Sequence, residues 1–254
     1  MSKWEKQRKE REGLVFINTQ GCKGVIVKYV TSQEVYARFE NCPYDIKTSY
    51  SYVQNGSIKN PYHPTCYGVG YLGVGKYKPC VNGKKTVAYT KWTGMMERCY
   101  APKYKNSHAS KLKTSSVCEY WHNFQNFAEW HEKNYYGVDG EIMCLDKDIL
   151  VKNNRVYSPE TCIYVPNRIN IMFTKSEAAR GDLPIGVTLH KKRQIYGVKC
   201  SGYYVGEYKN VQDAFNAYKQ FKENYIKQIA NEYVDKIPNQ LYEAMINYEV
   251  EITD

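Results

Sequence analysis

Residues 145–170, "LDKDILVKNNRVYSPETCIYVPNRIN", hold the pattern on which the interpretation of the whole chain depends. The stretch is typical of a β-hairpin that runs into a helix, with Asn153 and Asn154 at the turn between the strands. Acidic, basic and amide side chains crowd this short segment. They form either a polar loop rich in turn residues or a metal-binding site, and the surrounding sequence is needed to distinguish the two.

The charge and aromatic content of the chain favour an anionic partner. The 254 residues contain 36 Lys and Arg against 26 Asp and Glu, a formal net charge of +10, which indicates nucleic acid or a membrane surface. The 26 tyrosines add flat apolar faces with polar tips, which suit contacts with bases. No apolar run is long enough to cross a bilayer and the first residues lack the core of a signal peptide, so we expect a cytoplasmic protein.

The cysteines indicate neither a disulfide framework nor a zinc ribbon. There are nine of them, an odd number, and no two form a C-x-x-C pair. We expect most to be buried thiols. A structural zinc built from distant cysteines stays an alternative, with Cys99, Cys118, Cys144 and Cys162 as its candidate ligands.

The length suits two or three modules, and the pattern changes along the chain accordingly. Residues 1–13 alternate Lys, Arg and Glu and predict a basic arm, either a frayed helix or disordered. Residues 14–75 hold short β-branched and aromatic runs that predict a small β-module. Residues 76–180 follow and predict two helices. The first is predicted near 86–100, and its apolar face consists of Trp92, Met95, Met96 and Cys99. The second is predicted near 119–133, and its apolar stripe consists of Tyr120, Trp121, Phe124, Phe127 and Ala128.

Residues 181–254 predict three short strands followed by a long helix, with turns at "KKRQ" and "SGYY" and Asn210 as the helix N-cap. The predicted buried side of the helix consists of Ala214, Phe215, Ala217, Tyr218, Phe221 and Ile226. The sheet's other face is predicted to be free and to show His190, Lys191, Arg193, Tyr196, Lys199 and Tyr203. Together these patterns predict an α+β protein.

The C-terminal part resembles the APETALA2-type DNA-binding domain. The matching residues are "GV" at 186–187, Tyr196 where the family usually has Trp, "VGEY" at 205–208 and "AFNAY" at 214–218. The resemblance implies that the sheet lies in the major groove and that the strand residues of its free face contact double-stranded DNA.

The central part resembles the HNH nucleases of the His-Me finger class, especially the phage homing type, whose site is a β-hairpin followed by a helix. Aligned on "SPETCIYVPNRIN", the resemblance places Asp146 at the metal-ligand position and Asn170 at the final ligand position on the helix. It implies one Mg²⁺ or Mn²⁺ ion, with Arg98 as a candidate phosphate clamp. The family's loop asparagine is expected to be replaced near Tyr157 or Ser158. "GSIKNP", residues 56–61, is similar to a segment that ends a small barrel in such nucleases.

The chain departs from this pattern at the general base, because Lys147 stands where the family has histidine. An ordinary lysine is charged near neutral pH and cannot take a proton from water. A metal ion beside Lys147 would favour the neutral amine, so that Lys147 acts as the base or holds the attacking water. Asp146 and Asp148 would favour the charged form, a salt-bridged structural residue.

These expectations lead to one function and two rivals. The first is a phage-encoded endonuclease, acting in the cytoplasm of a bacterial host, that hydrolyses double-stranded DNA with a divalent metal. The second is a catalytically inactive DNA-binding protein, a phage regulator or counter-defence factor, that retains the nuclease fold. The third is an interaction protein whose basic face docks an acidic host enzyme, with no DNA involved. No membrane partner is expected.

Overall fold

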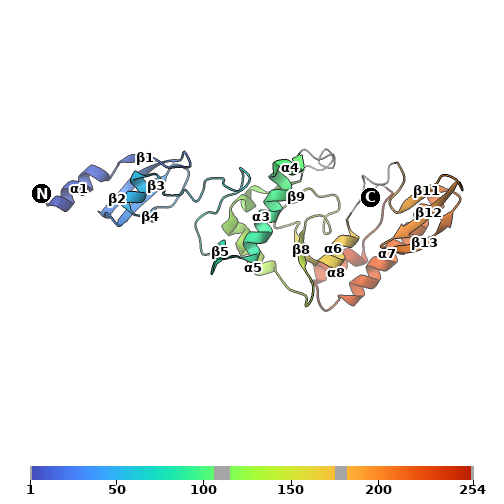
Figure 1. Cartoon of the computed structure of the whole chain (residues 1–254). Helices are drawn as coiled ribbons and strands as arrows, with labels where there is room; N and C mark the ends of the chain where they lie inside the picture. The colour runs from blue at the N-terminus through green and yellow to red at the C-terminus, as the bar shows by residue number, and fades with distance from the viewer. Residues whose placement is uncertain (1, 106–114, 175–181, 253–254) are drawn as a thin grey trace. The chain divides into compact units, whose positions relative to one another are not determined.

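The computed structural model describes residues 2–105, 115–174 and 182–252 and confirms the expected α+β class (Figure 1). The chain divides into two compact units. The first comprises Met1–Lys105 with Val117–Glu132, and the second contains Lys133–Asp254. The helices predicted near 86–100 and 119–133 therefore belong to the first unit, whereas the hairpin at 145–170 belongs to the second.

The first unit begins with a four-stranded antiparallel sheet in the order β1-β2-β3-β4. Its elements are α1 (Lys3–Arg11), β1 (Val15–Ile17), β2 (Lys23–Thr31), β3 (Glu34–Phe39), β4 (Ile46–Thr48) and α2 (Tyr50–Gln54). Buried side chains alternate along β3, where Val35, Ala37 and Phe39 face a core shared with Ile26 of β2. This alternation is the pattern that predicts a half-buried strand.

The predicted basic arm is a helix attached to this sheet. Ser2 and Glu5 form a capping box at the start of α1. The Trp4 indole N–H donates to the carbonyl oxygen of Val30 at 2.7 Å, and the Arg11 guanidinium lies 4.0 Å from the centre of the Tyr50 ring. Of the two alternatives left open for residues 1–13, the helix is the one that forms.

The first unit continues with helices that follow their predicted apolar faces. Its elements in chain order are β5 (Cys80–Val81), β6 (Lys84–Lys85), α3 (Val87–Tyr100), α4 (Pro102–Lys105), β7 (Ser116–Val117), a 3₁₀ helix over Glu119–His122 and α5 (Phe124–Asn134). Thr86 caps α3, and Trp92, Met95 and Met96 are buried on one side of it.

One predicted stripe is wrong at its first position, since Tyr120 is 54 % exposed whereas Trp121, Phe124, Phe127 and Ala128 are buried. The reason is local. Asn123 is extended and its side-chain oxygen accepts the Gln125 N–H at 3.0 Å, so the 3₁₀ turn and α5 are separate elements with separate faces.

The second unit contains the hairpin and the C-terminal sheet. Its elements are β8 (Met143–Asp146), β9 (Val156–Tyr157), β10 (Ile163–Pro166), α6 (Asn167–Met172), β11 (Val187–His190), β12 (Ile195–Cys200), β13 (Tyr203–Tyr208), α7 (Val211–Glu232) and α8 (Asn239–Ile246). β8 and β10 pair antiparallel, with Ile163 opposite Asp146, and α6 packs against both strands. β11, β12 and β13 form an antiparallel sheet in that order.

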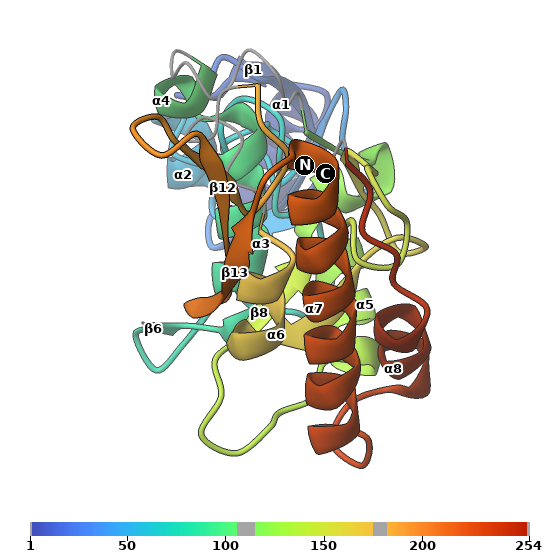
Figure 2. The same ribbon diagram turned by 90° about the vertical axis from the view of Figure 1, so that its right-hand side faces the viewer.

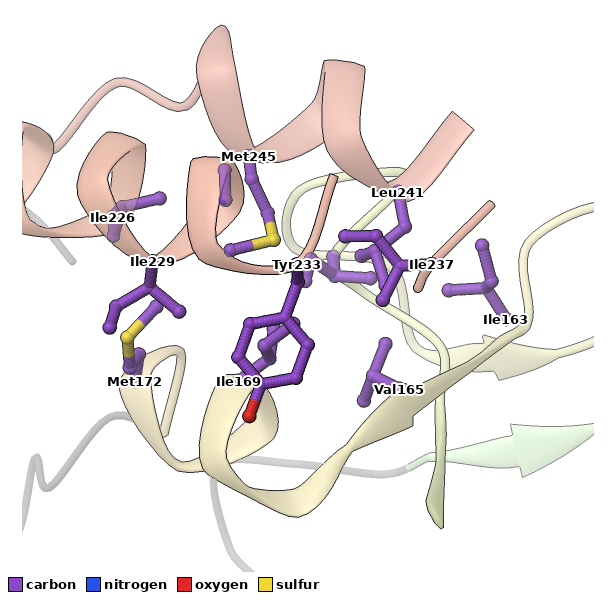
Figure 3. Close-up of a cluster of buried hydrophobic side chains, with 12 residues drawn as sticks. Ile163, Val165, Ile169, Met172, Ile226, Ile229, Tyr233, Ile237, Leu241 and Met245 are labelled. Atoms are coloured by element: carbon purple, nitrogen blue, oxygen red, sulfur yellow. The ribbon is translucent and has the colours of Figure 1, made fainter. Parts of the chain in front are cut away.

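Helix α7 contributes to two cores. Its first half packs against the sheet, where Ala214, Phe215 and Tyr218 meet Val187 and Val198. Its second half joins the hairpin and α6, and α8 packs alongside it (Figure 2). Figure 3 shows this second core, in which Ile226 and Ile229 of α7 and Tyr233, which follows the helix, lie with Val165, Ile169 and side chains of α8. One helix thus holds the hairpin and the sheet.

The predicted buried side of α7 needs one correction. Ala214, Phe215, Tyr218 and Ile226 are buried, but Ala217 and Phe221 are only partly so. The buried stripe instead runs through Lys222, which lies between Tyr218 and Ile226 at a position four residues from each. A spacing of four residues keeps side chains on one helical face, so the charged residue belongs to the core-facing side.

A substitution at Gly186 tests the packing of the core between the C-terminal sheet and α7. It has φ +73°, and a Cβ atom there would lie 2.1 Å from Cδ2 of Tyr218. Gly186→Ala therefore adds backbone strain and a clash inside the core, and we expect it to lower the free energy of unfolding by about 3 kcal/mol in urea titrations.

Gly202→Ala is the matched control, because Gly202 has φ +86° but no heavy atom within 4 Å of the added Cβ. It should lower the free energy of unfolding by about 1 kcal/mol, because only the backbone strain is added and no clash. Equal losses in the two variants would show that Tyr218 does not pack on Gly186.

Candidate functional site

Asp146 is the last residue of β8, and one of its carboxylate oxygens accepts hydrogen bonds from backbone N–H groups. Oδ1 accepts the N–H groups of Asp148 at 2.9 Å and Ile149 at 2.8 Å. Its strand partner Ile163 belongs to the core beneath α6 and α7, and directly paired residues share one face of a sheet. Asp146 therefore projects towards the helices. Within the described residues no donor is bound to Oδ2, which leaves one oxygen for a ligand.

The surroundings of Asp146 oppose its negative charge. Burial raises the pKa of Asp146, and the neighbouring carboxylate of Asp148 raises it further. The two backbone N–H groups and Lys147 act in the opposite direction but do not outweigh burial. A carboxylate held in this way is stabilised by any cation that reaches its free oxygen.

Asn170 lies on α6, one residue after the buried Ile169 and one before the exposed Ile171, and is itself half-buried. Because α6 packs against β8, Asn170 and Asp146 belong to neighbouring elements of one ββα unit. The expected order of hairpin and helix is therefore present, but Asn153 and Asn154 lie in a long loop that also contains β9, and not in a tight turn between the paired strands β8 and β10. That the two side chains grip a single cation stays a prediction.

The donor set suits a hard cation. One carboxylate and one amide oxygen match Mg²⁺, which keeps several waters and takes one or two protein carboxylates. Within the described ranges, no three His, Cys, Asp or Glu side chains gather as a zinc centre needs. The nine cysteines are free thiols, but the expectation that most are buried is wrong, since only Cys42, Cys162 and Cys200 are. The zinc alternative is left without support.

Lys147 is held as an ion-paired side chain. Its Nζ lies 3.1 Å from Oδ2 of Asp148 and 5.8 Å from the centre of the Tyr157 ring, and the side chain is 13 % exposed. Of the two states weighed for this residue, the contacts correspond to the salt-bridged one. An ammonium group paired in this way has no lone pair with which to accept a proton from water.

The loop between β8 and β10 contains Asn154, one of the two asparagines predicted at the turn. Asn154 donates through Nδ2 to the carbonyl oxygens of Lys147 and Val156, both at 2.7 Å, and its Oδ1 accepts the Val156 N–H. That the family's loop asparagine is replaced near Tyr157 or Ser158 stays a prediction. Asn154 ties the loop directly to the backbone of Lys147, so its amide fixes the position of that residue.

Arg98, the candidate phosphate clamp, belongs to α3 of the first unit, whereas Asp146 belongs to the second. Arg98 lies in the last turn of that helix, two residues after the buried Met96. Its role in the candidate site stays a prediction.

The free face of the C-terminal sheet differs in part from the predicted one. Val187, Val198 and Cys200 face α7, so the intervening Thr188 and Lys199 face away from it. His190 also lies on the free face, where its ring covers Gly197. Lys191 is exposed in the turn that follows β11.

Tyr196 and Tyr203 were predicted on the free face, and this is wrong for both. Tyr196 packs on the core with α7, and the Tyr203 ring lies 5.8 Å from that of Phe221. Tyr203 pairs with the buried Cys200 and so shares its side of the sheet. The exposed tyrosine on the free face is Tyr204, which pairs with Lys199. The β-bulge after Val198 changes the pairing register with β13, a change that the sequence pattern does not reveal.

Arg193 is exposed but already has a partner. It donates to both carboxylate oxygens of Glu207, at 2.7 and 2.6 Å, across the end of the sheet. Its guanidinium therefore offers less free charge than expected, and Lys191 and Lys199 carry more of the positive charge of this face.

Comparisons with family models, with curated proteins and with solved structures found no match for this chain. Over the described residues, no helix combines the length and apolar character that a membrane crossing requires. The resemblances to the nuclease and DNA-binding families therefore rest on the motifs alone.

The environment of Asp146 predicts a pH-dependent stability. As pH rises above the ordinary value of 3.8, the unfolded chain ionises Asp146 while the fold still holds the proton, so folding loses stability until pH exceeds the raised pKa. Asp146→Asn removes this loss. We expect the variant to gain stability relative to the original chain as pH rises from about 4, measured by urea unfolding with a metal chelator present.

Asp139→Asn is the control, because Asp139 is an exposed aspartate of the same unit. Added Mg²⁺ should stabilise the original chain and the Asp139 variant but not the Asp146 variant. Stability curves that run parallel over this pH range would contradict the assigned environment of Asp146.

Proposed function

We propose that this protein is a DNA-binding, HNH-like endonuclease that hydrolyses phosphodiester bonds with one divalent metal ion. The observation that carries the proposal is the ββα unit, in which a half-buried carboxylate has one oxygen without a donor among the described residues, next to a helix that bears an asparagine. The net charge of +10 and the exposed lysines of the C-terminal sheet support duplex DNA as the partner.

Helix α7 gives the proposal its geometry. It is 22 residues long, about 33 Å, and packs with the sheet at one end and with the ββα unit at the other. Two cores on one helix resist bending, so the sheet would set the position of the hairpin on bound DNA. A sheet in the major groove would place the candidate metal site within reach of the backbone of the same duplex.

In this proposal Oδ2 of Asp146 and the amide oxygen of Asn170 hold Mg²⁺ or Mn²⁺ together with waters. The metal would stabilise the charge that develops on the phosphate and the leaving oxygen. Asn154 fixes the loop that carries Lys147, and Arg98 would neutralise a phosphate of the bound strand.

The salt bridge between Lys147 and Asp148 favours a second candidate function. An ammonium group cannot serve as the general base, so the hairpin would bind DNA without cutting it unless another group activates water. The alternative is therefore a catalytically inactive DNA-binding protein, a regulator or counter-defence factor, that retains the nuclease fold.

Substitutions in the hairpin separate the two functions. The substrate is a plasmid that carries a site selected by the protein from random duplexes, and nicking is followed with Mn²⁺. Asp146→Ala should abolish nicking. Lys147→His supplies a group that can accept a proton near neutral pH, and it should raise the nicking rate about 100-fold.

Lys147→Met is the control, since it breaks the salt bridge without adding a base. If neither the original chain nor the Lys147→His variant nicks a site that both bind, the endonuclease proposal fails and the DNA-binding alternative stands.

A second test concerns the free face of the C-terminal sheet as the DNA-contacting surface. Lys199→Met removes one exposed charge beside Tyr204, so it should weaken duplex binding and reduce the slope of log K against log salt by about one. Fluorescence anisotropy at several salt concentrations measures both effects.

Lys227→Met removes an equivalent charge from the exposed side of α7 and should leave the slope unchanged. Identical slopes in the two variants would exclude this face of the sheet as the DNA-contacting surface.

A further inference from the structure

A cavity of about 620 Å³ lies in the second unit where α6, the ends of β11 and β12, and the middle of α7 meet. Its walls are partly aromatic and apolar, from Tyr218 and Tyr225 of α7 and Met172 of α6, and Ser201 adds a hydroxyl. The volume is that of a small-molecule site, which is typically about 300 to 1,000 Å³. The candidate metal ligands Asp146 and Asn170 are not among the residues that line it.

Lys222 brings a charged group into this cavity. It is 8 % exposed and lies on the core-facing stripe of α7, where the neighbouring stripe positions are Tyr218 and Ile226. Within the described residues, no acceptor or carboxylate is paired with its Nζ. Burial accordingly lowers the pKa of Lys222. An unpaired ammonium in such a place is costly, and an anion in the cavity removes the cost.

The charged residues around Lys222 do not neutralise its ammonium group, so a ligand can do so. The described residues that line the cavity include no Asp or Glu. Arg168, which also lines it, is already paired with Glu232 at 2.9 Å and lies 5.8 Å from the centre of the Tyr233 ring. The described residues that line the cavity therefore supply no negative charge to Lys222.

We propose that this cavity binds a nucleotide, with the Lys222 ammonium as the counter-ion of its phosphate group. Lysine is a point-charge partner for phosphate, and serine hydroxyls donate to phosphate oxygens. The tyrosines and the apolar wall suit the face of a base. The nucleotide is either free or the 5′-phosphorylated end of a DNA strand, and these two sources share the same chemistry.

The proposal is independent of DNA cleavage, because it uses neither the ββα ligands nor Lys147. It has a structural consequence of its own. The cavity adjoins both cores of α7, so a bound nucleotide bridges α6 of one core to β12 of the other and stabilises the whole second unit.

The experiment measures ligand binding to the full chain by calorimetry and by thermal shift. The probes are inorganic phosphate, deoxyadenosine 5′-monophosphate, deoxyadenosine, and one short duplex with and without a 5′-phosphate. The variants are Lys222→Met and, as a matched control on the exposed side of the same helix, Lys227→Met.

We expect the original chain and Lys227→Met to bind the monophosphate, and to bind it more tightly than deoxyadenosine. Lys222→Met should bind it at least tenfold more weakly while gaining thermal stability without ligand, because its buried charge is gone. Preference for the monophosphate over the phosphorylated duplex identifies a free nucleotide, and the reverse preference identifies a DNA end.

A second measurement does not depend on the folding of any variant. In the original chain, the monophosphate should protect Lys222 from acylation, as read by mass spectrometry, and leave Lys227 unprotected. The proposal is overturned if none of the phosphate-bearing probes binds, if Lys222→Met binds them as tightly as Lys227→Met, or if Lys222 is acylated equally with and without the monophosphate.

Discussion

The second unit depends on the burial of one helix in two cores. Phe215 and Tyr218 pack against the three-stranded sheet, and Ile226 and Ile229 pack against the hairpin and α6. Each fully buried side chain of this size contributes roughly 1.5 to 3 kcal/mol. Separating the sheet from the hairpin would therefore expose apolar surface on both sides of α7. This shared burial joins the sheet and the hairpin through α7 within one compact unit.

The polar groups of this unit fall into two kinds. Lys147 and Arg193 have carboxylate partners, so their charges are largely satisfied within the fold. Asp146 keeps one oxygen without a donor among the described residues, and Lys222 is buried without a described partner. Burial disfavours the charged form of both side chains, so it raises the pKa of Asp146 and lowers the pKa of Lys222. Buried groups whose charge is not balanced within the fold are common at ligand sites, and the two proposed sites are built on these two side chains.

Local sequence patterns predicted the helices and strands correctly where the apolar periodicity runs unbroken through the element. The helix around Trp92 and the strands of the C-terminal sheet follow their apolar periodicity, and Asn210 caps α7 as expected. Predictions failed where a single residue broke the period. Asn123 starts α5 anew and leaves Tyr120 exposed, and the bulge after Val198 changes which tyrosine of β13 lies on the free face. A bulge or a cap inside a run changes side-chain direction without changing composition.

By itself, the sequence determined the α+β class, the order of hairpin and helix around residues 145–170, and the basic character of the chain, because these follow from local periodicity and net charge. Only the tertiary structure decided how those parts are joined. It shows that α7 serves two cores, that Asn154 ties the loop to Lys147, and that Lys222 borders a cavity. These features depend on packing between segments far apart in the chain, and such packing leaves no mark on the pattern of any one segment.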